Sequence, residues 1–209
     1  MKNELRNVLS GKSEVRFGEI IQSISSYLGT SSQTSTTAKD SKLFRKQETE
    51  SLEAFILDNN LWINDIDFSR YVSEGAEQKV YLKDSKHVIK LNDGIYYASW
   101  QDYFHNLLLH NFFFSDTAYE LLGFTKDDKN VLYAVVQQYF VTVTTTTDLR
   151  QVREFLTQNG FLNSRNDDYF NDELGIILED LHDENVLTNN GILFFIDTVF
   201  YLKENFWKD

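Results

Sequence analysis

The chain has 209 residues, the length of one domain or of one domain with an appendage. Its 20 lysines and arginines against 32 aspartates and glutamates give a net charge of −12, which argues against binding to nucleic acid or to an anionic membrane surface. Cysteine is absent, so disulfides, thiol catalysis and cysteine-ligated metal sites are excluded. With no signal peptide and no long apolar run, the sequence predicts a soluble, cytoplasmic protein.

The N-terminal part of the chain has the pattern of a helical extension. Apolar residues recur at helical spacing over residues 17–28 and predict an amphipathic helix. Residues 30–37 are small and polar, which is typical of a flexible linker; the alternative interpretation is a cluster of hydroxyl acceptors for phosphorylation. A further helix is predicted over residues 42–58. We therefore expect two parts, an extension over residues 1–42 and one domain over residues 43–209.

The rest of the chain alternates between strand and helix patterns. Strands are predicted over residues 79–82, 87–91, 119–124, 131–143, 175–178, 186–187 and 192–196, and helices over residues 98–112 and 148–159. The sequence Asn189-Asn190-Gly191 between the last two strands is typical of a tight hairpin, since Asn and Gly tolerate a positive φ. This order of elements predicts an α+β fold and not a doubly wound one.

An acidic loop between two apolar strands carries the chemically most informative residues. Asp180 and Asn185 lie in this loop, and Asp197 directly follows the strand over residues 192–196. A hairpin would bring the end of that strand back to the loop, so we expect the three side chains to converge. Oxygen ligands in a chain without cysteine favour a hard cation such as Mg²⁺. Asp and Asn are also common turn formers, so the loop taken alone has an ordinary structural interpretation as well.

The spacing of these residues is the one that protein kinases use: an Asp, four residues, an Asn and then an Asp after a hairpin form the phosphoryl-transfer site of those enzymes. Three further features lie upstream of the loop, in the order in which they occur in kinases. Lys90 lies on a strand that resembles the one carrying their phosphate-binding lysine. Residues 73–81, with Gly75, occupy the place of the hairpin that covers the phosphates. The strand that contains Gln138 ends where kinases contact the adenine.

The resemblance extends over about residues 61–202 and is carried by the runs GAEQKVYL, VIKLND, AYELLGF, LEDLHDENVL and LFFIDTVFYL. In these runs the sequence resembles the small kinase-like domain found in polyvalent proteins of bacterial mobile elements. Its acidic loop is also similar to the D-L-H-x-x-N loop of aminoglycoside phosphotransferases. The resemblance implies a protein-kinase-like two-lobe fold, with a nucleotide lobe over about residues 61–143 and a reduced C-terminal lobe over about residues 144–209.

The resemblance also implies ATP and Mg²⁺ as cofactors and a hydroxyl-bearing small molecule or protein as acceptor. It assigns the following roles: Asp180 orients the acceptor hydroxyl and takes its proton, Asn185 and Asp197 hold Mg²⁺, Lys90 neutralises phosphate charge, the backbone near Gly75 covers the phosphates, and Gln138 belongs to the strand end that meets the adenine. Positioning and charge neutralisation are the main requirements of phosphoryl transfer, so these few groups would suffice.

Several departures from the kinase pattern leave an alternative open. Gly75 is the single glycine of the expected phosphate-covering hairpin, and Thr198 follows Asp197 where kinases have a phenylalanine. Too few residues remain after Asp197 for an activation loop, which argues against protein substrates. The glutamate that normally pairs with the lysine is not identified, and Asp102 and Glu77 are the candidates for its place. The alternative function is therefore an inactive pseudokinase that binds nucleotide or a protein partner.

Overall fold

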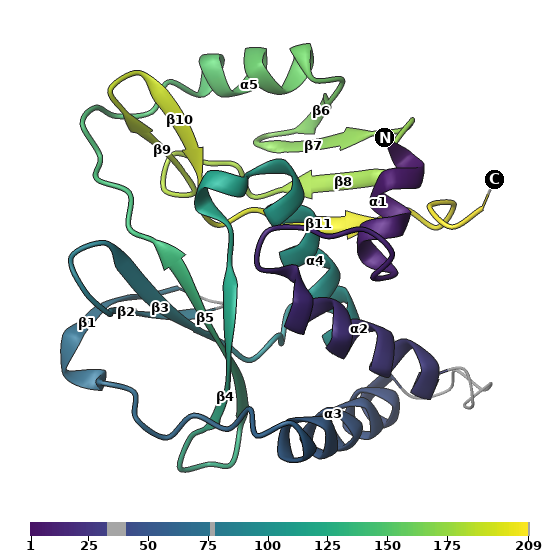
Figure 1. Ribbon diagram of the computed structural model, residues 1–209. Coiled ribbons are helices and arrows are strands. Elements are labelled where there is room, and N and C mark those ends of the chain that lie inside the picture. The colour runs from purple at the N-terminus through teal and green to yellow at the C-terminus, as the bar shows by residue number, and fades with distance from the viewer. Residues whose placement is uncertain (33–40, 76–77, 209) are drawn as a thin grey trace.

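The computed structural model describes residues 1–32, 41–75 and 78–208 of the chain. Within these residues, one lobe is an antiparallel five-stranded sheet with strand order β1-β2-β3-β5-β4 (Figure 1). Its strands are β1 (Tyr71–Glu74), β2 (Gln78–Leu82), β3 (His87–Asn92), β4 (Glu120–Lys126) and β5 (Leu132–Tyr139). The register places Lys90 on the central strand opposite Val80 on one side and Val136 on the other. This lysine therefore projects from the middle of the sheet, where it is 3% exposed.

Helix α4 (Trp100–Phe113) links β3 to β4 through the short 3-10 turn Ser115–Thr117 and packs in the core between the lobes (Figure 1). Its first turn is capped twice. The Ser99 hydroxyl accepts a hydrogen bond from the Asp102 amide, and the Glu48 carboxylate accepts from the amides of Trp100 and Gln101 at 2.6 and 3.0 Å. Such caps satisfy amides that have no partner within the helix. Burial raises the pKa of the Glu48 carboxyl, while the two backbone hydrogen bonds lower it.

Three helices of the N-terminal part cover the core face of α4. They are α1 (Lys2–Leu9), α2 (Gly18–Ser32) and α3 (Ser41–Asp58). Their apolar residues, among them Ile21, Ile24 and Leu52, are buried in the same core cluster as α4. The predicted linker lies partly in the last turn of α2 and otherwise, from residue 33 on, outside the described residues. The boundary that we expect at residue 42 stays a prediction.

The second lobe is small and consists mainly of strands (Figure 1). Helix α5 (Leu149–Gln158) is capped at its N-terminus by Asp148, whose carboxylate accepts a hydrogen bond from the Arg150 amide. The strands that follow are β6 (Leu162–Arg165), β7 (Asp168–Asn171), β8 (Ile176–Glu179), β9 (Val186–Asn189), β10 (Ile192–Phe195) and β11 (Val199–Leu202). In the described part of the chain, four of them form a sheet of order β11-β8-β7-β6, and β9 pairs with β10. The predicted α+β fold with two lobes and a reduced second lobe is thus confirmed.

Several elements differ from the prediction. Helix α1 and strands β6, β7 and β11 were not expected, and β6, for example, is exposed along its whole length and carries no alternation of apolar and polar residues. The strand predicted over residues 131–143 is shorter, because β5 ends at Tyr139 and residues 140–143 lead across to the second lobe. An apolar run does not reveal where hydrogen bonding to a neighbouring strand stops.

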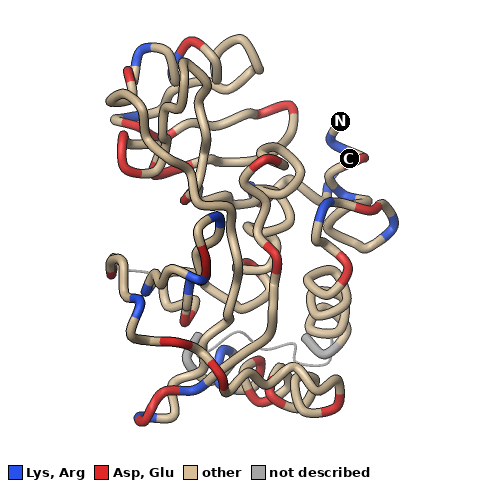
Figure 2. The backbone as a smooth tube through the Cα atoms, turned by 60° about the vertical axis from the view of Figure 1, so that its left-hand side comes forward, with Lys and Arg blue, Asp and Glu red and all other residues tan. Residues whose placement is uncertain are grey.

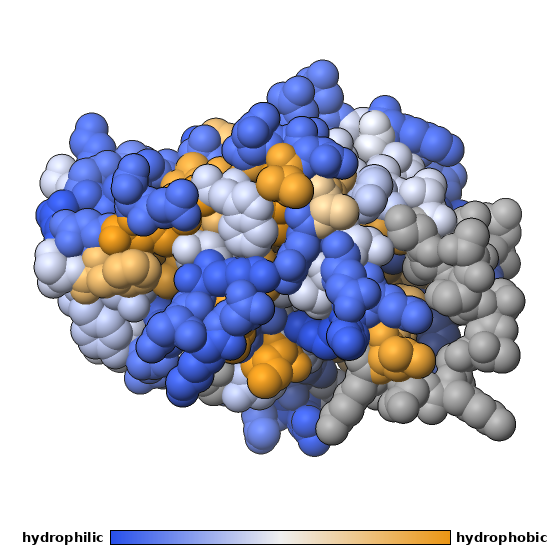
Figure 3. Space-filling model, turned by 90° about the horizontal axis from the view of Figure 1, so that it is seen from below, coloured by the Kyte–Doolittle hydropathy of each residue, from blue (hydrophilic) through white to orange (hydrophobic). Residues whose placement is uncertain are grey.

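The surface reflects the composition of the chain. Figure 2 shows acidic residues spread along both lobes. From below, the described surface is largely hydrophilic with separate apolar patches (Figure 3). Among the described residues, no helix combines the length and the apolar character needed to cross a membrane.

His105, which is buried on α4, should make stability depend on pH. Burial lowers its pKa from 6.5 to about 4, although Asp102 raises it, and the described residues offer no hydrogen-bond partner to its Nδ1 atom. As the pH falls from 6.5 to about 4, His105 binds a proton in the unfolded chain but stays neutral in the folded chain. The protein should therefore lose on the order of 3 kcal/mol of unfolding free energy over this range through His105.

The variant His105→Leu removes this titration and places an apolar side chain at the buried site. Denaturant unfolding at a series of pH values should give a shallower acid dependence for the variant than for the wild type. Parallel curves for the two proteins would show that His105 does not control the acid stability.

Candidate active site

A cleft of about 580 Å³ lies between the two lobes. The sheet contributes Val80 and Val88 to its walls, and the second lobe contributes Leu187. The lysine of β3 and the acidic residues of the loop after β8 line the same cleft. A concave site with apolar walls and a few convergent charged groups is typical of ligand binding.

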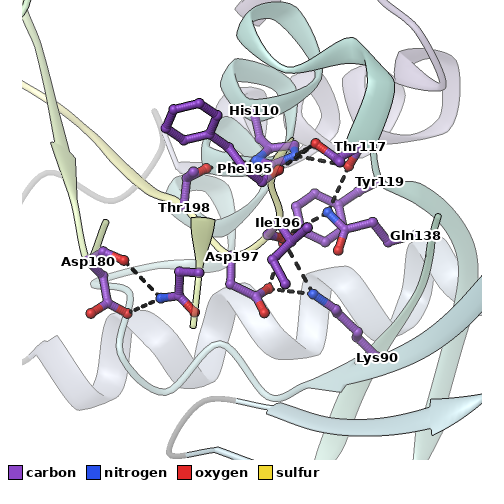
Figure 4. A network of polar contacts seen from close by, with 11 residues as sticks. Lys90, His110, Thr117, Tyr119, Gln138, Asp180, Phe195, Ile196, Asp197 and Thr198 are labelled. Carbon is purple, nitrogen blue, oxygen red and sulfur yellow. Dashed lines mark hydrogen bonds and ion pairs between the residues drawn. The ribbon is translucent and has the colours of Figure 1, made fainter. Parts of the chain in front are cut away.

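Lys90 and Asp197 meet at the back of the cleft (Figure 4). The Lys90 ammonium lies 2.6 Å from Oδ1 of Asp197, which one residue, Thr198, separates from the start of strand β11. The ammonium also lies 5.5 Å from the centroid of the Tyr119 ring. A lysine as buried as this one needs a compensating charge. The structure therefore joins a residue of the five-stranded sheet to a residue of the second lobe, 107 positions apart in the sequence.

The acidic loop between β8 and β9 has a defined shape. Asp180 adopts a left-handed conformation with φ of 67°, which is uncommon for a residue with a side chain. The Asn185 side-chain amide donates to the backbone oxygen of Asp180 at 2.9 Å and to its carboxylate at 2.8 Å. The backbone oxygen of Asn185 accepts from the amide of Ile196 at 2.9 Å, next to Asp197. The expected convergence of Asp180, Asn185 and Asp197 on one cleft is thus what the structure shows.

His182 stabilises the loop, because both of its ring nitrogens contact residues of the loop itself. Its Nδ1 atom accepts from the backbone amide of Glu184 at 3.2 Å, and its Nε2 atom lies 3.3 Å from Oδ1 of Asp180. Asp168 accepts a further bond from the Asp180 amide at 3.3 Å. These contacts hold the Asp180 carboxylate, which is about half exposed, at the mouth of the cleft.

The oxygen atoms of Asn185 and Asp197 fit a hard cation. Both amide hydrogens of Asn185 are directed to Asp180, and no described residue donates to its amide oxygen. Oδ1 of Asp197 accepts from Lys90 and Tyr119, whereas its other carboxylate oxygen has no partner among the described residues. One amide oxygen and one carboxylate oxygen therefore remain as acceptors, which is the donor chemistry that Mg²⁺ prefers. No cluster of three or more His, Asp or Glu side chains suited to a metal occurs in the described part of the chain.

Gly75 and Gln138 both line the cleft but differ in what they offer. Gly75 lies in the turn between β1 and β2, where a Cβ atom would meet nothing within 4 Å, so the space at this position does not require glycine. Gln138, 2% exposed, donates its side-chain amide to the backbone oxygens of Thr117 and Ile196 at 2.7 and 2.8 Å. Its side chain thus holds the segment before Asp197, and the expected adenine contact of this strand end stays a prediction.

One expectation is corrected by the structure. The carboxylate that pairs with Lys90 belongs to Asp197, whereas Asp102 accepts from the Ser99 hydroxyl at 2.7 Å at the start of α4. Glu77, the other candidate, lies outside the described residues. The side chain of Asp102 is used at the helix terminus, so position in the sequence was a poor guide to this contact.

Four buried polar residues in the cleft region were not expected from the sequence: His110, Thr117, Tyr119 and Thr198. Tyr119 donates from its hydroxyl towards the backbone oxygen of Ile196 at 2.5 Å and Oδ1 of Asp197 at 2.9 Å. Burial, with the nearby Asp197 charge, raises the pKa of Tyr119 well above its usual value. Burial lowers the pKa of His110 to about 3. The available signal was the polar end of each side chain, which must find a partner when the residue is buried.

The comparisons with known proteins agree with this geometry. A family model for serine/threonine/tyrosine kinases found in polyvalent proteins matches residues 45–204, which is most of the chain and includes both lobes of the cleft. No curated protein matches the chain. The similarity of the acidic loop to that of aminoglycoside phosphotransferases stays a prediction. The chain therefore belongs to the family of serine/threonine/tyrosine kinases found in polyvalent proteins.

Proposed function

We propose that this protein transfers the γ-phosphoryl group of ATP, with Mg²⁺, to a hydroxyl group of a small molecule or a protein. The observation that supports it best is the meeting of Lys90, Asp197, Asn185 and Asp180 at one cleft between the lobes. The family supports kinase-like activity in general. The nucleotide, the metal and the acceptor are part of our proposal.

Each residue has a role that its environment supports. The open oxygens of Asn185 and Asp197 would hold Mg²⁺, which neutralises phosphate charge when bound. The Lys90 ammonium is held at the back of the cleft, where it would neutralise phosphate oxygens in exchange for part of its contact with Asp197. Asp180, at the mouth, would orient the acceptor hydroxyl and accept its proton. The amide of Asn185 fixes the Asp180 carboxylate for this step. Prearranged charges of this kind are effective in a partly dehydrated cleft.

A pseudokinase is the second candidate, and one observation favours it. Lys90 forms its ion pair with Asp197, the residue proposed to hold the metal, so in this structure the two groups neutralise each other. A protein that kept this pair would bind nucleotide weakly and would act through a protein partner. The oxygens left open on Asn185 and Asp197, and the exposed Asp180 carboxylate, support the active enzyme.

Thermal unfolding with and without ATP, each with and without Mg²⁺, tests the nucleotide site. A ligand that binds only the folded state at about 1,000 times its Kd adds roughly 4 kcal/mol, which for a chain of this length raises Tm by about 10 °C. We expect this rise with ATP and Mg²⁺ together, and a much smaller one with Mg²⁺ alone or with ATP and a chelator. The absence of a shift under all conditions would contradict the proposed function.

Phosphoryl transfer then separates the enzyme from the pseudokinase. The purified chain incubated with Mg²⁺ and ATP should acquire phosphate on hydroxyl residues, with the small polar residues over 30–37 as the first positions to map by mass spectrometry. A Tm shift without phosphate on the chain or on offered small-molecule acceptors would favour the pseudokinase.

A further inference from the structure

Helix α4 gives Lys90 no carboxylate partner. The sequence of α4 contains one acidic residue, Asp102, and it is bonded to Ser99. On the cleft side of the helix, Asn106 accepts from the amide of Phe200 at 2.8 Å and so serves strand β11. The position of Lys90 must therefore be set by groups other than a carboxylate of this helix.

Tyr119, just before strand β4, lies where it can set that position (Figure 4). Its ring contacts the Lys90 ammonium, and its hydroxyl has one proton to share between the Ile196 oxygen and Asp197, which both belong to the same segment. The backbone of Tyr119 is itself held by Asn111 of α4, which accepts from its amide at 2.7 Å and donates to its oxygen at 2.8 Å. Tyr119 thus has a fixed backbone and a hydroxyl that is directed at Ile196 and Asp197.

His110, whose ring centroid lies 4.6 Å from that of Tyr119, reaches the same segment at Thr198, the residue after Asp197. Its Nε2 atom lies 2.9 Å from the backbone oxygen of Thr117, which can only accept, so in the neutral ring Nε2 carries the proton. Its Nδ1 atom is then an acceptor and receives the hydroxyl hydrogen of Thr198 at 2.7 Å. Thr117 in turn donates from its hydroxyl to the backbone oxygen of Phe195 at 2.5 Å. The residues on both sides of Asp197 are therefore tied to buried groups of α4 and the following turn.

We propose that Tyr119 and His110 are positioning residues, which hold Lys90 and the segment 195–198 so that Asp197 faces the cleft, in the place of a carboxylate on α4. This inference rests on the proposed function, because Lys90 and Asp197 are the groups that would meet the nucleotide phosphates and the metal. Tyr119 bonds to Asp197 and to Ile196 before it in the sequence, and His110 bonds to Thr198 after it. Loss of either contact should therefore loosen the segment while Lys90 and Asp197 themselves remain in the cleft.

Two substitutions that remove only a hydroxyl test this role. Tyr119→Phe keeps the ring and removes the bonds to Ile196 and Asp197, whereas Thr198→Val keeps the shape of Thr198 and removes the bond to His110. Thr198→Ser restores the hydroxyl and should restore wild-type behaviour. Tyr169→Phe is the matched control, since Tyr169 is equally buried but lies in strand β7, outside the cleft.

The first readout needs no ligand. Hydrogen exchange measured by mass spectrometry on the ligand-free protein should show faster exchange over residues 192–199 in Tyr119→Phe and Thr198→Val than in the wild type, Thr198→Ser and Tyr169→Phe. The second readout is calorimetry with ATP. The gain in ATP affinity on adding Mg²⁺ should fall about tenfold or more in Tyr119→Phe and Thr198→Val. This is the effect expected when a hydrogen bond to Asp197 or to the segment that carries it is lost.

The outcomes are separable. Wild-type exchange and wild-type Mg²⁺-dependent affinity in Tyr119→Phe or Thr198→Val would overturn the positioning role while leaving the proposed function in place. A wild-type protein that binds no nucleotide would overturn the proposed function and with it the catalytic meaning of this network, even if exchange changed. Because the two variants remove different hydrogen bonds of the segment, one that folds is enough to decide if the other does not.

Discussion

Asp197→Ala should abolish phosphoryl transfer and weaken the binding of Mg²⁺-ATP by about 100-fold or more, whereas Asp180→Ala should abolish transfer and leave that affinity within a few-fold of wild type. The difference follows from position. Asp197 lies at the back of the cleft with one carboxylate oxygen open, and Asp180 is half exposed at its mouth. A metal ligand contributes to nucleotide binding, while a catalytic base contributes about 10²- to 10⁴-fold to the rate alone.

Calorimetry with ATP in the presence of Mg²⁺, together with a transfer assay, measures both effects. Asp183→Ala is the matched control, because this exposed residue lies in the same loop and has no role in the proposed site. Asp197→Ala also removes the partner of a buried lysine, so Asp197→Asn should be measured beside it to separate loss of the ligand from loss of the fold. Equal nucleotide affinity in the wild type, Asp197→Ala and Asp197→Asn would rule out the metal role of Asp197.

Lys90→Met should reduce phosphoryl transfer by about 100-fold or more and raise the Kd for ATP. Methionine has a similar length but no charge, so the phosphates would lose their one cationic side chain among the described residues that line the cleft. Asp197 would still accept the hydrogen bond from the Tyr119 hydroxyl, but it would lose its ion pair with the Lys90 ammonium, which lies 2.6 Å away in the wild type. The free energy of unfolding should fall as well, because the carboxylate is mostly buried and would lack a counter-charge.

Lys79→Met provides the control for Lys90→Met. Lys79 lies on the neighbouring strand β2, one residue before Val80, which is opposite Lys90. Its side chain therefore points to the other face of the sheet, where its ammonium lies 5.4 Å from the centroid of the Tyr133 ring. The variant Lys79→Met should leave both phosphoryl transfer and ATP affinity unchanged. Transfer by Lys90→Met at a rate within a few-fold of wild type would remove Lys90 from the proposed mechanism.

Local structure was largely predictable because it depends on residues that are close in sequence. The hairpin between β9 and β10 is an example: Asn190 and Gly191 adopt φ of 48° and 79°, as the sequence Asn-Asn-Gly predicts. Asp148 caps α5 through its own side chain, again within a few residues. By contrast, the cap that Glu48 provides for α4 comes from another helix and has no signal in the residues around Trp100.

The candidate site divides in the same way. The residue types and their order along the chain, Lys90, then Asp180 and Asn185, then Asp197, indicated the chemistry of the site, and the resemblance of the longer sequence runs implied the kinase-like family and its two-lobe fold. Only the tertiary structure decided that Lys90 pairs with Asp197 and not with Asp102, and that Tyr119 and His110 lie beside this pair. The reason is physical. A short motif carries its chemistry in its own side chains, but the partner of a buried charge is the group that packing brings within about 3 Å, from any distance along the chain.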